Sequence, residues 1–101
     1  MPPTPPGAVT TRFDPSRPWT LHPQVSLRPE AFGALAYHFG TRRLSFLKSR
    51  TLLAVVESLE GQPSGRTACL AAGVGPAELE TYERALATLA ESGMICPRDT
   101  P

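Results

Sequence analysis

Apolar and polar residues alternate over 25–48, the period expected of β-strands with one buried face. In this segment, VSLR (25–28) predicts a first strand. Pro29 ends this strand or confines it to a sheet edge, because proline has no amide donor for a ladder. Residues 30–33 can form the following turn. ALAYHF (34–39) predicts a second strand, with Leu35, Tyr37 and Phe39 on one face.

The third strand is predicted at RLSFLK (43–48), where Leu44 and Phe46 alternate with Ser45 and Leu47. Gly40-Thr41 precedes it and suits a two-residue hairpin turn in which glycine takes a positive φ. We therefore expect an antiparallel meander with the second strand at its centre.

The hydrophobic period changes from two to about 3.6 after Ser49, which predicts helices. Ser49 can cap a helix to about Glu60, and Ser64 can cap a second one over 65–72. Pro76 suits the first position of a third helix that ends near Ser92 and Gly93. Met94 and Ile95 should fold back onto the core. The apolar stripes predicted to be buried are Leu52, Leu53, Val55, Val56 and Leu59 on the first helix, and Leu79, Tyr82, Leu86 and Leu89 on the third.

Three strands followed by three helices predict an α+β fold that resembles a winged helix with its sheet first. The chain has 101 residues and 12 prolines, six of them in 1–18. We expect a Pro-rich disordered tail over 1–18, one recognition domain over 19–95 and a short flexible tail over 96–101.

The composition of the chain argues against several classes of function. The net charge is +1, no basic tract marks a lipid or nucleic-acid surface, and no apolar run is long enough for a membrane helix. The N-terminus lacks the apolar region of a signal peptide, so we expect a cytoplasmic protein whose Cys69 and Cys96 are free thiols. Cys69 stands where a small buried residue fits.

DNA binding is the obvious function of a winged helix and remains the alternative. The third helix would read the groove, yet it carries four glutamates against Arg84, and phosphates would repel it. The basic residues are expected to cluster around the hairpin, where they belong to a solvated tip or attract an acidic peptide. These residues are Arg42, Arg43, Lys48 and Arg50.

Catalysis is not expected. His22 and His38 lie at no metal-ligand spacing, and no phosphate loop, nucleophile elbow or paired carboxylates stand out. His38 is interpreted as a surface or cross-strand residue. We expect no cofactor.

One edge of the predicted sheet is free. Pro29 blunts the first strand, whereas the third has neither proline nor glycine, so another polypeptide can add a strand there or a partner protein can dock. The third helix would form the far wall. Which flank it presents stays open: Glu78, Ala85 and Ser92 lie on one, Ala87 and Ala90 on the other.

The segment WTLHPQVSLRPEAFGALAYHFGTRRLSFLKS (19–49) resembles the MftB family of mycofactocin peptide chaperones, densely to about Val56 and more loosely to Ile95. A more distant resemblance is to PqqD-like recognition elements of ribosomal peptide biosynthesis. Such proteins bind the leader of a precursor peptide and present it to a radical S-adenosylmethionine maturase. The resemblance implies no iron–sulfur cluster in this chain, which has only two cysteines.

In related recognition domains the leader pairs with the third strand and packs against the third helix. The resemblance and the free edge thus indicate the same groove. The predicted peptide-binding residues are Arg43, Leu44, Ser45, Phe46, Leu47, Lys48, Glu78, Tyr82, Ala85 and Leu89.

Overall fold

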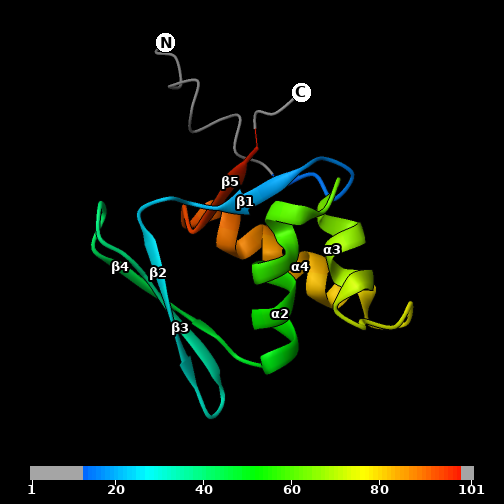
Figure 1. The fold of residues 1–101 in the computed structure, drawn as a ribbon, viewed down its shortest axis with the longest axis horizontal. Coiled ribbons are helices and arrows are strands. Elements are labelled where there is room, and N and C mark those ends of the chain that lie inside the picture. The colour runs from blue at the N-terminus through cyan, green and yellow to red at the C-terminus, as the bar shows by residue number, and fades with distance from the viewer. Residues whose placement is uncertain (1–12, 99–101) are drawn as a thin grey trace.

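The helices of this protein all lie on one side of an antiparallel sheet, as the computed structural model shows (Figure 1). The structure describes residues 13–98, so residues 1–12 of the predicted N-terminal tail and 99–101 of the predicted C-terminal tail lie outside it. The strands and helices, in order, are β1 Trp19–Leu21, β2 Val25–Glu30, β3 Gly33–His38, β4 Arg43–Leu47, α2 Arg50–Ser58, the short 3-10 helix η1 Leu59–Gly61, α3 Gly65–Ala71, α4 Leu79–Glu91 and β5 Ile95–Pro97.

The main sheet has the order β2-β3-β4, which confirms the predicted meander and the α+β plan of three strands followed by three helices. Leu35 pairs with Phe46, and Tyr37 pairs with Leu44. Pro29 lies inside β2, where it faces Ala34 across the ladder. An edge strand tolerates this proline because its other side has no strand to bond.

The predicted two-residue turn at Gly40-Thr41 is wrong. β3 ends at His38 and β4 begins at Arg43, so four residues connect them. The positive φ belongs to Arg42, at 64°, and the Arg42 amide donates to the His38 carbonyl oxygen. The side chain of His38 determines this geometry, because its Nδ1 accepts from the amides of Gly40 and Thr41 at 3.1 Å each.

The face of the sheet that is turned toward the helices, its inner face, packs into the hydrophobic core (Figure 1). Ala34, Ala36 and Leu47 are at most 1% exposed there, against buried residues of the three helices. His38 is also buried and pairs across the sheet with Val25 and Arg43, so its interpretation as a cross-strand residue is confirmed and that as a surface residue is wrong. Its amide-accepting Nδ1 explains how a polar ring is tolerated inside, since a buried polar group needs a hydrogen-bond partner.

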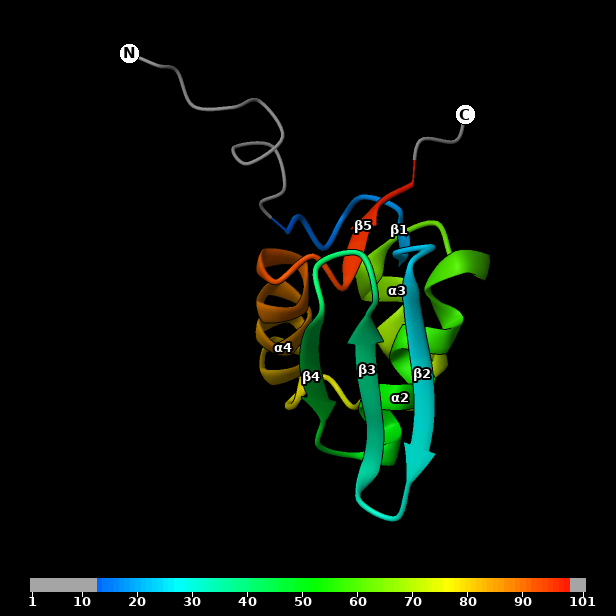
Figure 2. The same ribbon diagram turned by 90° about the vertical axis from the view of Figure 1, so that its left-hand side faces the viewer.

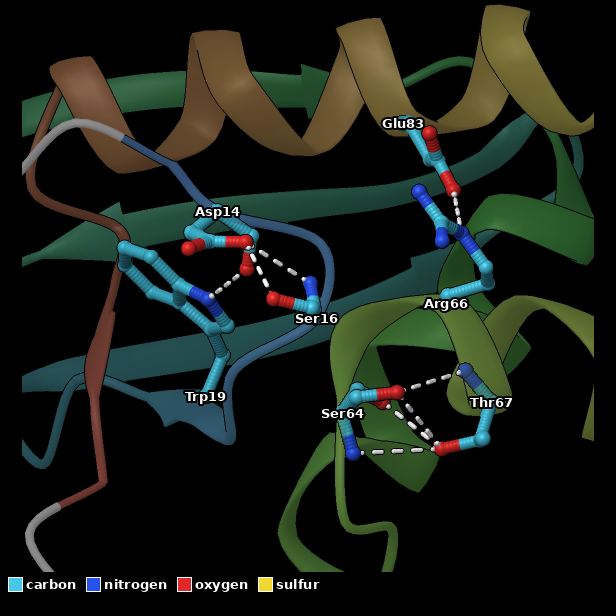
Figure 3. A network of polar contacts seen from close by, with 7 residues as sticks. All are labelled: Asp14, Ser16, Trp19, Ser64, Arg66, Thr67 and Glu83. Atoms are coloured by element: carbon cyan, nitrogen blue, oxygen red, sulfur yellow. Dashed lines mark hydrogen bonds and ion pairs between the residues drawn. The ribbon is translucent and has the colours of Figure 1, made fainter.

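The helix caps follow the sequence closely at two of the three starts. Ser49 Oγ accepts from the Leu52 amide, and Ser64 forms a reciprocal capping box with Thr67 (Figure 3). The predicted start of the third helix at Pro76 is wrong, because α4 begins at Leu79 and residues 76–78 form a turn before it. Glu78 occupies the cap position and makes no side-chain bond there.

A second, two-stranded sheet of β1 and β5 was not predicted. It joins both ends of the domain, with Leu21 paired to Ile95. Segment 13–18, assigned to the tail, is hydrogen-bonded to the domain. The carbonyl oxygen of Asp14 accepts from Trp19 Nε1 at 2.9 Å (Figure 3). The carbonyl oxygen of Arg17 accepts from the Gly65 amide at 3.0 Å. The domain boundary at residue 18 stays a prediction.

Gly33 is the residue on which the position of β4 depends. Its φ is 151°, and a Cβ there would clash with the Leu47 carbonyl oxygen and with the backbone of Ser49. We predict that Gly33→Ala lowers the free energy of unfolding by more than about 1 kcal/mol in urea titrations. Gly61→Ala is the matched control, since a Cβ at Gly61 meets nothing within 4 Å. Equal stability of both variants would contradict this account.

His22 stacks against His38, with ring centroids 4.4 Å apart. Burial, and then the neighbouring His38, lower the pKa of His22 from its ordinary value of 6.5. The folded state therefore prefers neutral His22, and this contribution is complete above the ordinary pKa and is lost as pH falls through the lowered one. We predict that stability falls from about pH 7.5 to about pH 5.5, and less steeply in His22→Gln. An identical slope in the variant would refute the assignment.

Candidate functional site: a groove between β4 and α4

The outer edge of β4 has no strand partner among residues 13–98. Its backbone pairs with β3 on one side only, and α4 lies across a groove from the other side (Figure 2). An unpaired edge presents amide donors and carbonyl acceptors that another extended chain can bond. In the part of the chain that the structure describes, the predicted free edge is therefore present.

A groove of about 460 Å³ lies between this edge and the helices. Its walls are mostly apolar, with Ser45, Lys48 and Thr88 as the polar contributions. The lining residues are Leu44, Ser45, Phe46, Lys48, Leu52, Ala85, Thr88 and Leu89. Open apolar walls with a few polar groups are typical of ligand sites.

Six of the ten predicted site residues line this groove: Leu44, Ser45, Phe46, Lys48, Ala85 and Leu89. The other four do not. Arg43 is exposed at the start of β4, and Glu78 is exposed in the turn before α4. Leu47 is 1% exposed and Tyr82 packs partly buried against the core, so both serve the interior.

The flank of α4 that faces the groove is now defined. Ala85 lines the groove, whereas Ala90, from the other candidate flank, is buried in the core. Thr88 was missed although it lies three residues after Ala85, a spacing that places both on one helical face. Leu52 was also missed as a lining residue, because the sequence assigned it only to the core stripe of its helix.

Contacts on the side of α4 away from the groove hold this helix in place. Leu86 is fully buried, and Glu83 accepts from Arg66 Nε of α3 at 2.8 Å (Figure 3). Because Glu83 lies in this ion pair, it does not add a free negative charge to the helix. Arg84 likewise pairs with Glu80 at 3.3 Å.

The four basic residues expected around the hairpin are in fact divided between the two ends of β4. Arg42 and Arg43 lie at the hairpin, whereas Lys48 and Arg50 follow the strand. Arg43 and Lys48 are five positions apart in extended chain, or about 16 Å. The groove thus has cations at both ends, and Lys48 is part of its wall.

The thiols take no part in this groove. Cys69 is buried, and desolvation raises its pKa to about 11, so it stays protonated and unreactive at neutral pH. Within 13–98, no group of three or more His, Cys, Asp or Glu side chains is placed to hold a metal ion. None of the helices in that range has the length and apolar character to cross a membrane.

The sequence of this chain matches a known protein family. The model of the peptide chaperone MftB family matches residues 18–96, most of the described domain. The peptide chaperone MftB of Mycobacterium tuberculosis (strain ATCC 25618 / H37Rv) is 57% identical over 93 residues, which cover 92% of this chain and 85% of that protein. That of Mycobacterium ulcerans (strain Agy99) is 60% identical over 87 residues, 86% of this chain and 80% of its own.

No solved structure matches the chain. The fold and the groove define a small α+β domain with an apolar site beside a strand edge that has no partner within residues 13–98. The chain belongs to the peptide chaperone MftB family, which confirms the resemblance seen in segment 19–49. Its relatives are named as chaperones of peptides and not as enzymes.

Proposed function

We propose that this protein binds the leader of a ribosomally made precursor peptide, that of the mycofactocin system, and presents it to a radical S-adenosylmethionine maturase without itself catalysing a reaction. The observation that carries the proposal is the apolar groove beside the unpaired edge of β4. Its family name supports a peptide as the ligand. We place this activity in the cytoplasm.

Strand addition is the binding mode that this geometry favours. Backbone bonds to the β4 edge provide affinity, and alternate side chains of the peptide enter the groove between β4, Leu52 and Ala85. The groove follows β4 from Leu44 to Lys48, a length of about 13 Å, which accommodates about two or three side chains on one face of an added strand. Each fully buried apolar side chain contributes about 1.5–3 kcal/mol before the cost of ordering the peptide.

The positive charges beside the groove add a preference for certain peptides. Lys48 in the wall and Arg42 at the hairpin lie in no ion pair within residues 13–98. They favour a leader with acidic side chains and speed its approach, an effect that salt weakens. The same cations do not favour a DNA site, because α4 offers phosphates no free cation: Arg84 pairs with Glu80, Glu83 is neutralised by Arg66, and Glu91 is acidic.

The sharpest test of the groove is to fill it. Ala85 is half-buried in the wall, so Ala85→Phe should occupy the space that peptide side chains require. We predict a loss of affinity for the precursor peptide of at least about tenfold, measured by calorimetric titration.

Ala71→Phe is the matched control, because Ala71 is exposed on α3 and is not in the groove wall. It should bind the peptide like the unmodified protein. Unchanged binding by a folded Ala85→Phe variant would show that the peptide lies elsewhere. Tighter binding to duplex DNA than to the peptide, in the same buffer, would replace the proposal with the DNA alternative.

A further inference from the structure

The outer face of the sheet, turned away from the helices, carries an unusual number of large apolar side chains. Leu35 and Tyr37 of β3 stand beside their cross-strand partners Phe46 and Leu44 of β4. Phe32 and Phe39 extend this set into the connections at the two ends of β3. We call these six residues the outer apolar face; Figure 2 looks onto the side of the sheet where it lies.

The side chains of the outer apolar face are largely exposed and do not belong to the hydrophobic core. Five of its six members are 40% to 55% exposed, and Leu70 is the one other large hydrophobic residue exposed to this degree in 13–98. The helices cover the opposite face, and no element of 13–98 covers this one (Figure 1). Contiguous exposed apolar residues of this kind mark a surface that another molecule covers.

A peptide in the groove would leave much of this face open. Leu44 and Phe46 belong both to the groove wall and to the outer apolar face, so the two surfaces are continuous. A strand added at the β4 edge lies about 5 Å from β4 and about 10 Å from β3. Side chains reach directly opposite and diagonal neighbours at about 5–8 Å, so such a strand does not cover Leu35 or Tyr37.

The rim of the face is cationic. Lys48 follows Phe46 with the same alternation and makes no ion pair within the described residues, and Arg42 lies in the loop beside Phe39. The acidic Glu30 on β2 is bound by Arg28 at 3.0 Å. A complementary surface is therefore apolar at its centre and acidic at its rim.

We propose that the outer apolar face docks a folded protein with such a surface, namely the maturase that receives the peptide. This inference rests on the proposed function. A peptide strand at the β4 edge would extend the same sheet, so the docked protein would meet β3, β4 and the peptide on one continuous face. The chaperone thereby fixes the position of the peptide relative to the enzyme.

A substitution at Tyr37 tests the outer apolar face without altering the groove, because this side chain is 40% exposed and does not line the groove. The experiment compares Tyr37→Ser with Leu70→Ser, a control that removes an exposed apolar side chain on α3. Affinity for the radical S-adenosylmethionine maturase is measured with and without saturating precursor peptide, and affinity for the peptide is measured separately. Circular dichroism checks folding, and Phe39→Ser, in the exposed loop, serves as the second variant.

We expect Tyr37→Ser to weaken maturase binding by at least about tenfold and to change peptide affinity by less than about twofold. Leu70→Ser should change neither. Unchanged maturase affinity in folded Tyr37→Ser and Phe39→Ser variants would overturn the proposal, as would an equal loss of peptide affinity, which would assign the face to the peptide. Loss of a homodimer on substitution, seen by sedimentation, would assign it to a second copy of this chain.

The two proposals fail separately. If the unmodified protein binds no precursor peptide, the proposed function is wrong. The maturase titration without peptide still tests the outer apolar face in that case.

Discussion

The unpaired edge of β4 is the constraint on which the rest of this structure depends. A strand bonded on one side only is prone to unwanted pairing, and proteins commonly protect such edges by keeping them short or charged. Here β4 has five residues, Arg43 begins it and Lys48 follows it, and α4 lies across the groove from it. These features limit nonspecific pairing while they leave a groove that an extended peptide of suitable side chains can enter.

The walls of the groove are held by interactions that do not reach into it. Ala34 and Ala36 give the inner face of β3 a small-residue surface, and α2 packs against it so that Leu52 reaches the groove. On the far side, buried Leu86 and the Arg66–Glu83 pair fix α4 against the core and against α3. A site on such rigid elements loses little conformational entropy when it binds.

The sequence predicted the parts of this fold that local patterns determine. The alternation of apolar and polar residues predicted the strands, and the serines at 49 and 64 predicted two helix starts. The lack of proline or glycine in 43–48 indicated the free edge. The buried side of the sheet was not evident, because the larger apolar residues lie on its outer side: the small Ala34 and Ala36, not Tyr37, face the core. The turn was wrong because the buried ring of His38 accepts loop amides, a tertiary effect, and β1 with β5 are three residues each, too short for a pattern.

Hydrogen exchange of the β4 backbone amides tests the central claim most directly. If a peptide strand completes the sheet, those amides of residues 43–48 that do not bond to β3 should exchange at least about tenfold more slowly when the precursor peptide is saturating, while amides of α3 keep their rates. If the peptide binds and exchange along β4 stays the same, the edge is not the site and the account is wrong.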